Sequence, residues 1–121
     1  MTDNDTLFAI LDSAKELGIK VKAGIIKTHD ALFLESRFAH DGVEERIRPW
    51  RELGVLAIDN EVSAMLTVAS ILGMQAGAVL VAVDNYTTGE AIDFDKDYDR
   101  LIADAIEIST RALAKLISED K

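Results

Sequence analysis

Acidic side chains follow three apolar segments of the sequence, at the points where buried strands would end. The three groups are Thr28-His29-Asp30, Asp59-Asn60-Glu61 and Asp84-Asn85-Tyr86. In a parallel sheet the residues after each strand collect at one edge, where ligands bind in open α/β folds. Carboxylates gathered there could accept hydrogen bonds from ligand hydroxyls, transfer a proton as general acid or base, or bind a hard cation.

Glu61 and Asp59 each admit two interpretations. Glu61 opens an otherwise apolar helix, where an ionised carboxylate is costly to bury unless hydrogen bonds or a ligand compensate. The alternative is a helix-start carboxylate that the helix dipole favours. Asp59 could likewise serve only as a cap or turn residue that closes the strand.

Asp84 and Asp30 also follow apolar segments. Asp84 comes after six uninterrupted apolar residues, so it must emerge at the edge of the sheet. Its alternative is a local Asx turn in the loop over residues 84–89. Asp30 is interpreted as structural, because a Thr-x-Asp pair after a strand can tie its own loop through side-chain to backbone hydrogen bonds.

Several kinds of chemistry lack the residues they need. There are no cysteines, which removes thiolate metal sites and cysteine nucleophiles. The only histidines, His29 and His40, have no second ligand at metal-binding spacing, so no metal site is expected. No nucleophile elbow, dinucleotide fingerprint or P-loop occurs. Lys27 is the only cation close to a predicted strand end, so an anion site built from this sequence alone would be weak.

Hydrophobic periodicity and turn residues predict an α/β fold. Helices are predicted over residues 6–17, 43–53, 60–72 and about 95–118, strands over 19–26, 55–58 and 76–83, and a loop over 31–42. The second helix is expected to break near Pro49, with Trp50 anchoring it to the core. The third is expected to be buried, because it is apolar on nearly every side. Strands connected by helices pair in parallel, so the sequence predicts a layered sheet of mainly parallel strands flanked by helices, in a single domain over residues 1–121.

The charge and the ends of the sequence narrow the choice of partners. The net charge of −9 arises from 22 acidic and 13 basic residues, and should repel nucleic-acid phosphates and anionic lipids. The first residues do not resemble a signal or transit peptide. The longest apolar stretch, residues 76–83, is too short to span a bilayer. The sequence therefore predicts a soluble, cytoplasmic protein that binds neither nucleic acid nor membrane.

Three segments resemble hallmark motifs of the uridine and purine nucleoside phosphorylases. Residues 54–64, Gly-Val-Leu-Ala-Ile-Asp-Asn-Glu-Val-Ser-Ala, are similar to a strand that runs into a Glu-Met-Glu triplet opening a buried helix. Residues 81–90, Val-Ala-Val-Asp-Asn-Tyr-Thr-Thr-Gly-Glu, are similar to the purine-type segment Ser-Asp-His-x-Arg-Thr-Gly-Glu. Residues 24–33 are similar to a strand followed by Ser/Thr-x-Asp-x-Phe-Tyr. The three occur in the family's order, so nearly the whole chain resembles the C-terminal half of such an enzyme.

The resemblance implies roles for the residues at the strand ends. Glu61, with Asn60 and Asp59 beside it, would bind the ribose hydroxyls. Asp84 would be the general acid for the leaving base, which requires a carboxyl that keeps its proton at neutral pH. The base side would consist of Leu32, Phe33 and Asn85. The family implies no cofactor and no metal, with phosphate as co-substrate if the site is completed.

Four residues depart from the family's pattern. Asp59 replaces Glu, Asn60 replaces Met, Leu32 replaces Phe and Thr87 replaces Arg. In this family the phosphate is bound by a Gly-containing loop and by arginines of the N-terminal half. That half has no counterpart in the sequence, so the phosphate side of the site is expected to be missing.

Three functions remain open. The first is a nucleoside phosphorylase-like protein, part of a pentosyltransferase that cleaves the N-glycosidic bond of nucleosides. It would work as a homo-oligomer or as a heteromer with a chain carrying the N-terminal half, because part of a larger sheet exposes an apolar edge. The second is a non-catalytic nucleoside-binding or assembly module of the same fold. The third is an α/β domain whose acidic edge binds Mg²⁺.

Overall fold

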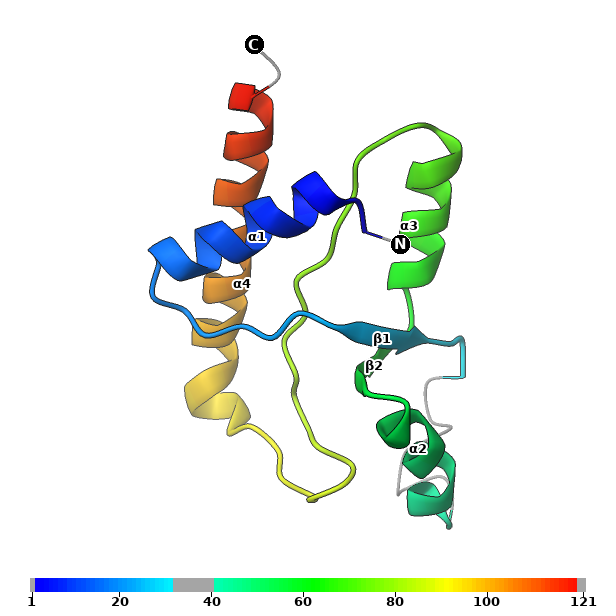
Figure 1. Cartoon of the computed structure of the whole chain (residues 1–121). Helices are drawn as coiled ribbons and strands as arrows, with labels where there is room; N and C mark the ends of the chain where they lie inside the picture. Colours follow the sequence, from blue (N-terminus) through cyan, green and yellow to red (C-terminus); the bar gives the residue numbers. More distant parts are fainter. Residues whose placement is uncertain (1, 32–40, 120–121) are drawn as a thin grey trace. The chain divides into compact units, whose positions relative to one another are not determined.

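The structure, a computed structural model, describes residues 2–31 and 41–119 of the chain. Helices and strands alternate in the first part of the chain and helices follow in the second (Figure 1). The elements are α1 (Asn4–Glu16), β1 (Ile25–Thr28), α2 (Val43–Glu52), β2 (Val55–Asp59), α3 (Val62–Ile71) and α4 (Phe94–Glu119). The predicted helices are all found, as is the predicted strand over residues 55–58. Strand β1 overlaps the predicted strand over residues 19–26 only at residues 25 and 26. Most of the predicted loop over residues 31–42 lies outside the described residues.

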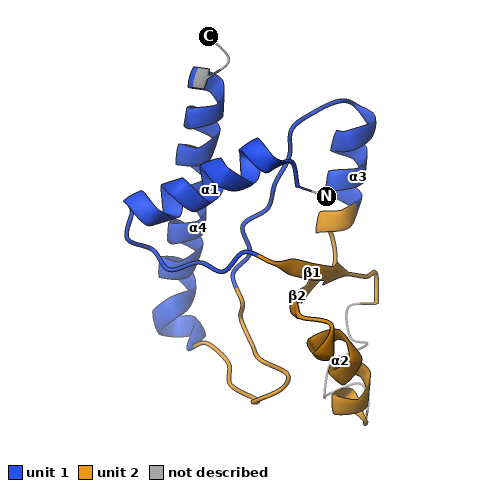
Figure 2. Ribbon diagram, viewed as in Figure 1, with its two compact units in different colours: residues 1–23, 64–81, 93–121 blue, residues 24–63, 82–92 orange. Residues whose placement is uncertain are grey.

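The chain divides into two compact units (Figure 2). The helical unit comprises Met1–Ala23, Ala64–Val81 and Asp93–Lys121. The strand unit comprises Gly24–Ser63 and Ala82–Ile92. The interpretation of residues 1–121 as one domain stays a prediction.

The strand unit is built on a parallel pair of strands. The register pairs Ile25 with Val55, Ile26 with Ala57, Lys27 with Ile58 and Thr28 with Asp59. One residue of β2, Leu56, has no partner residue in β1, so the register shifts by one position near the start of the pair. The predicted α/β class and the parallel pairing are confirmed, whereas a layered sheet of more strands stays a prediction.

Helix α2 packs against β2 and buries Val43 and Ile47. The predicted break at Pro49 is wrong, because α2 continues to Glu52. Proline removes only its own amide donor, and its carbonyl still accepts from the Leu53 amide at 3.1 Å, which closes the last turn.

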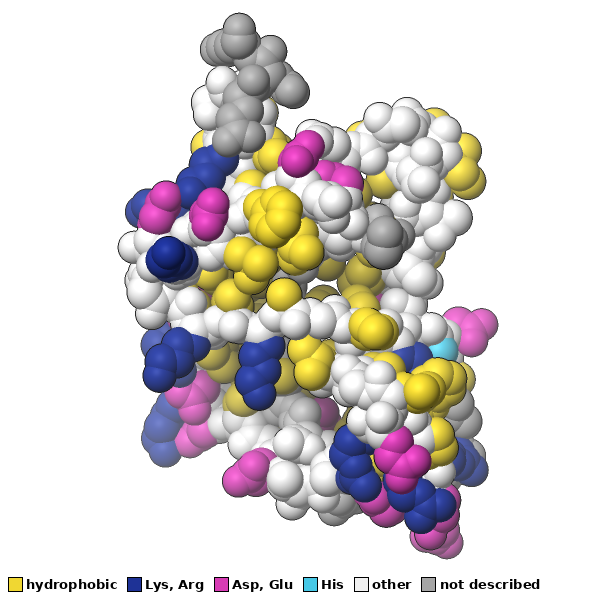
Figure 3. Space-filling model, viewed as in Figure 1, with side chains coloured by type: hydrophobic (Ala, Val, Ile, Leu, Met, Phe, Trp, Pro, Cys, Tyr) yellow, Lys and Arg dark blue, Asp and Glu magenta, His cyan; other side chains and the backbone are white. Residues whose placement is uncertain are grey.

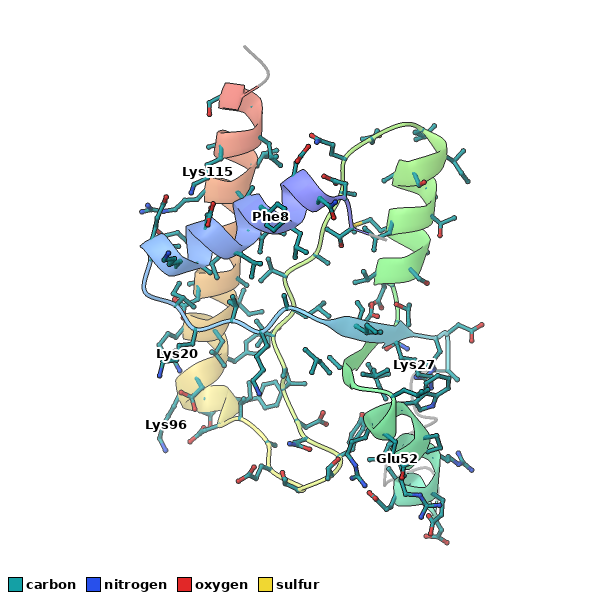
Figure 4. All side chains as sticks on the ribbon, viewed as in Figure 1. Phe8, Lys20, Lys27, Glu52, Lys96 and Lys115 are labelled. Atoms are coloured by element: carbon teal, nitrogen blue, oxygen red, sulfur yellow. The ribbon has the colours of Figure 1, made fainter. Side chains whose placement is uncertain are left out.

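Trp50 does not anchor α2 in a core, contrary to the prediction. Its side chain is 38% exposed, and the Lys27 ammonium lies 4.9 Å from the centroid of its ring. Figure 4 labels Lys27 on β1, beside α2. Such cation–π contacts at exposed positions contribute about 0.5–1 kcal/mol. Trp50 therefore joins α2 to β1 at the surface.

The helical unit is held by the packing of α1 against α4. Helix α1 starts at Asp3, whose carboxylate caps it by accepting from the Thr6 amide at 2.9 Å and the Thr6 hydroxyl at 2.6 Å. It ends at Glu16, and Gly18 follows with a φ of 70°, a left-handed conformation that glycine adopts without strain. The buried apolar residues of the pair are Ala9, Ala14, Ile108 and Ala112. Small side chains on both helices allow their backbones to approach closely.

Two segments predicted to be strands are not strands in the structure. Residues 19–24 and 76–83 have no regular secondary structure, and β1 begins only at Ile25. The prediction for residues 76–83 relied on burial on both faces of a sheet, but these residues are only half-buried or exposed. Residues with a high β-propensity fit a pleated, half-buried surface, but they form a strand only where a neighbouring strand is available for pairing.

Helix α3 is not buried, contrary to the prediction. Only Val62 and Ala69 are buried, whereas Val68 is 55% and Ile71 78% exposed. An apolar surface on every side predicts burial only where other elements surround the helix. Helix α4 buries Ile108 and Ala112, whereas Ile106 and Leu113 are exposed.

Candidate functional site

The ends of β1 and β2 meet at their last residues. Thr28 and Asp59 lie opposite each other in the register, and the Thr28 hydroxyl donates to Asp59 Oδ1 at 2.5 Å. The same hydroxyl oxygen accepts from the Ser63 amide at 3.2 Å. The first two predicted strand ends are therefore brought together, and both are joined to the first turn of α3. We call this cluster, Thr28, Asp59, Asn60, Glu61 and Ser63, the strand-end junction.

Asp59 also caps α3. Its Oδ2 atom accepts from the amides of Glu61 at 3.0 Å and Val62 at 2.7 Å. These amides have no partner inside the helix, since the first turn of any helix leaves its donors free. The geometry matches the cap interpretation of Asp59, and the sequence signal for it was an acid directly before a run of helix formers.

The electrostatics of Asp59 follow from these contacts. Partial burial raises the pKa of the Asp59 carboxyl, but the hydrogen bonds from the Thr28 hydroxyl and from the Val62 and Glu61 amides outweigh it, with a smaller contribution from His29. The pKa is therefore lowered from its ordinary value. Asp59 is an ionised hydrogen-bond acceptor at neutral pH, and not a proton donor.

Two further hydrogen bonds connect the loops that leave the strands. The Asn60 side-chain amide donates to the His29 carbonyl at 2.7 Å. The His29 amide donates to the Asp59 carbonyl at 3.1 Å. The predicted tie of Thr28 to its own loop is not what the structure shows, because its hydroxyl bonds to Asp59 instead. Asp30 is exposed.

Glu61 lies directly before the first residue of α3 and is exposed. Its amide is held by Asp59, as described above, so its backbone position is fixed by the junction. An ionised carboxylate at this end of a helix is favoured by the helix dipole. The junction thus presents the exposed Glu61 carboxylate on a backbone that hydrogen bonds hold in place. This carboxylate is a suitable acceptor for ligand hydroxyl groups.

The third predicted strand end forms a small turn of its own. Asp84 pairs with Ala91 in an isolated antiparallel bridge, and the Val83 carbonyl accepts from the Ile92 amide at 2.9 Å. The Asx turn expected at Asp84 is made by Asn85, whose side-chain oxygen accepts from the Thr87 and Thr88 amides. Asp84 itself is exposed. The described hydrogen bonds do not join Asp84 to the junction.

Arg51 connects α2 to this turn, a contact that no sequence pattern predicts. Its guanidinium donates to the Thr87 hydroxyl at 3.4 Å and forms a 2.7 Å ion pair with Glu44. All three side chains belong to the strand unit. The loop that follows Asp84 is therefore tied to α2 by a weak hydrogen bond from an arginine.

Leu32, Phe33 and His40 lie outside the described residues. Within residues 2–31 and 41–119, no group of three or more His, Cys, Asp or Glu side chains is arranged to hold a metal ion. In the same residues no helix is long and apolar enough to cross a membrane.

A pocket of about 190 Å³ lies in the helical unit. None of the residues that line it belongs to the three acidic strand-end groups. It is lined by α1, α4 and residues 75–79, with Thr6, Ile10 and Leu113 among them, and carries no acid or base. Catalysis by proton transfer needs titratable groups, so this pocket is not the candidate site.

Comparison with known proteins gives the family. The model of the phosphorylase superfamily matches residues 1–118. The chain belongs to the phosphorylase superfamily. This confirms the resemblance to nucleoside phosphorylases and agrees with the α/β fold and the parallel strand pair.

Relatives of this phosphorylase-superfamily chain include bacterial enzymes named purine nucleoside phosphorylase DeoD-type. The protein of Caldanaerobacter subterraneus subsp. tengcongensis is 35% identical over 101 residues, which are 81% of this chain and 40% of the relative. That of a Thermoanaerobacter species is 30% identical over the same length. That of Bacillus cereus is 31% identical over 86 residues, 71% of this chain and 34% of the relative. The chain thus spans about two-fifths of the length of the curated relatives it matches.

Proposed function

We propose that this chain forms the ribose- and base-binding side of a nucleoside phosphorylase-type site and acts in the cleavage of the N-glycosidic bond of nucleosides. The observation that carries the proposal is the strand-end junction, in which Thr28 and Asp59 meet and hold the start of α3 beneath Glu61. Two of the family-like segments therefore contribute to one hydrogen-bonded cluster. Phosphate would be the co-substrate, and no cofactor is needed.

Glu61 would accept hydrogen bonds from the ribose hydroxyls, with Asn60 and Asp59 beside it. Glycosidic cleavage develops positive charge on the sugar, and a fixed carboxylate is worth more as that charge appears. The exposure of Glu61 and the hydrogen bond to its amide support this role. The ionised state of Asp59 adds negative charge at the same edge.

Asp84 would act as the general acid, with Asn85, Leu32 and Phe33 on the base side. Asp84 sits at the start of a turn that Asn85 stabilises, so its backbone is well defined. Arg51 reaches Thr87, the position at which the family resemblance implies an arginine. A guanidinium from α2 would then take the place of the one that the family pattern has in the turn.

The phosphate side would come from another polypeptide segment, in a homo-oligomer or in a heteromer with a chain that carries the N-terminal half. Exposed apolar side chains support an assembly, since large apolar surfaces mark interaction sites. Hydrophobic side chains gather over α1, where Phe8 is 62% exposed (Figures 3 and 4). Met65 and Ile71 of α3 are exposed as well. The layered sheet would be completed in that assembly.

The proposal is tested by combining this chain with the part of the Caldanaerobacter relative that the match leaves out. Release of base from inosine is measured with and without phosphate. Phosphate-dependent release should fall at least about a hundredfold in Glu61→Gln and in Asp84→Asn. Glu107→Gln, an exposed acid of α4 that pairs with Arg111, is the matched control and should leave the rate unchanged. Release that survives both site substitutions would contradict the proposal.

A second candidate is a non-catalytic nucleoside-binding module of the same fold. It is favoured by Asn60 and Thr87, which replace the expected Met and Arg. Inosine should then raise the melting temperature of the chain by itself, whereas phosphate should not. Glu61→Ala should abolish this shift. No shift with any nucleoside would remove this candidate.

A further inference from the structure

The strand-end junction contains more hydrogen bonds than the pairing of two strands requires. The Thr28 hydroxyl donates to the Asp59 carboxylate at 2.5 Å and accepts from the Ser63 amide at 3.2 Å. One hydroxyl therefore connects the last residue of β1 to the last residue of β2 and to the first turn of α3. Side-chain hydroxyls that bond to ionised groups make the stronger class of hydrogen bond.

The carboxylate of Asp59 is directed into the chain. One oxygen accepts from Thr28, and the other accepts from the amides of Glu61 and Val62. A carboxylate has about four acceptor positions, so most of its capacity is used by the protein. Glu61, which follows two residues later, is exposed. The two acids therefore differ in what they can offer to a ligand.

We propose that Thr28 and Asp59 are positioning residues for Glu61. Thr28 fixes the orientation of the Asp59 carboxylate, and this carboxylate fixes the backbone from which the Glu61 side chain extends. Asp59 thus acts on the ribose site only through the backbone of Glu61 and does not itself contact the sugar. The inference rests on the proposed function, because it takes Glu61 as the ribose ligand.

The physical reason is preorganisation. A ligand that binds to a side chain on a fixed backbone loses less affinity to ordering than one that binds to a mobile segment. Without the Thr28 hydroxyl, Asp59 could rotate away from the amides of α3, and the first turn would fray. Val and Thr have similar shapes, so Thr28→Val removes the hydroxyl with little change in volume.

The test compares Thr28→Val and Thr28→Ser with the wild-type chain. Thr110→Val is the matched control, because it removes a hydroxyl that bonds only within α4, to the Ile106 carbonyl. Three quantities are measured: the pKa of Asp59 by carbon-13 NMR, the hydrogen exchange of the Glu61 and Val62 amides, and the affinity for inosine. Thermal unfolding of each variant checks that it is folded.

In Thr28→Val we expect a raised Asp59 pKa, faster exchange of both amides and about tenfold weaker inosine binding, because the Glu61 segment must then be ordered when the ligand binds. Thr28→Ser should restore all three, and Thr110→Val should change none. A purely structural role would lower the melting temperature without changing the affinity of the folded protein. Unchanged exchange and affinity in Thr28→Val would overturn the inference. If the wild-type chain does not bind inosine even when combined with the part of the Caldanaerobacter relative that the match leaves out, the proposed function fails, and the NMR titration and amide exchange still decide whether Thr28 holds Asp59 and the start of α3.

Discussion

Asp3 and Asp59 perform the same structural task in the two units of the molecule. Each carboxylate caps a helix, and each accepts one more hydrogen bond from a distant segment: Asp3 from the Ala76 amide at 3.0 Å, Asp59 from the Thr28 hydroxyl. Burial raises the pKa of each carboxyl, but the hydrogen bonds outweigh it and lower the pKa overall. Their surroundings differ, because Asp3 bonds to buried Thr6 and Asp59 precedes exposed Glu61.

The difference shows how one local device can serve two purposes. Beside a packed helix pair, the cap adds to the stability of a core that apolar contacts already hold. Beside an exposed acid, the same cap fixes the place of a group that can meet a ligand. Perturbing the helical unit should therefore change mainly stability, whereas perturbing the junction should change ligand affinity more than stability.

The largest effect is expected from Ile108, which is 1% exposed in α4. Ile108→Ala should lower the free energy of unfolding by about 3 kcal/mol, because it leaves a cavity in a core made otherwise of small side chains. Ile106→Ala, the same change at an exposed position two residues earlier, should cost less than about 1 kcal/mol. Urea denaturation measures both. Equal effects would show that the helix pair lacks the tight core described here.

A second pair of substitutions compares close approaches in the two units. A Cβ atom at Gly77 would lie 2.6 Å from Thr6 Cγ2, and Thr6 is buried and hydrogen-bonded. One at Gly24 would lie 2.4 Å from the end of Leu56, which is half exposed and can rotate. Gly77→Ala should therefore cost about 2 kcal/mol and Gly24→Ala clearly less. The reverse order in thermal melts would refute this account of the helical unit.

The caps themselves give the most direct comparison. Asp3→Ala and Asp59→Ala should each lower the free energy of unfolding by about 1 kcal/mol, the usual value for a lost side-chain cap. Asp59→Ala should also weaken inosine binding, and Asp3→Ala should not. Calorimetric titration with inosine separates the two outcomes. If Asp3→Ala weakened binding as much, the division of tasks would be wrong.

The smallest effect is a dependence of stability on pH. A carboxyl with a lowered pKa stabilises the folded state above the ordinary aspartate value, and this contribution is lost as the pH falls through the lower folded pKa. Asp3 and Asp59 should therefore make the chain less stable below about pH 4. The double variant Asp3→Asn, Asp59→Asn should show a flatter decline in melting temperature over this range. An unchanged slope would mean that other carboxyls account for acid unfolding.

The sequence was sufficient to predict those secondary-structure elements that depend on local residue patterns. The cap at Asp59 follows from an acid placed before helix formers, and the four helices follow from hydrophobic periodicity. It was not sufficient where the outcome depends on neighbours. The segment 76–83 has the composition of a strand, and α3 that of a buried helix, but their state depends on which surfaces cover them. The break predicted at Pro49 was wrong, because the loss of one amide donor does not end a helix in which the Pro49 carbonyl still accepts from the Leu53 amide.

The candidate site was predictable to a similar degree. The meeting of Thr28 and Asp59 followed from the rule that parallel strands end at one edge, once both strands were located. The hydrogen bond between them did not, because Thr28-x-Asp30 also fits a local tie. The contact of Arg51 with Thr87 joins residues far apart in the sequence, and no periodic pattern predicts it. The roles of Glu61 and Asp84 came from the family resemblance and stay proposals.

The unmatched Leu56 in β2 has a consequence for how this edge can change by insertion and deletion. In an uninterrupted register that starts from Ile25 and Val55, Thr28 would lie opposite Ile58, and the hydroxyl would face an alkyl chain. The extra residue advances β2 by one position and places Asp59 there instead. A single added residue near the start of the strand pair thus decides which side chain the hydroxyl meets. Changes of strand length could therefore create or erase the polar contacts of this edge without replacing any of the residues that make them.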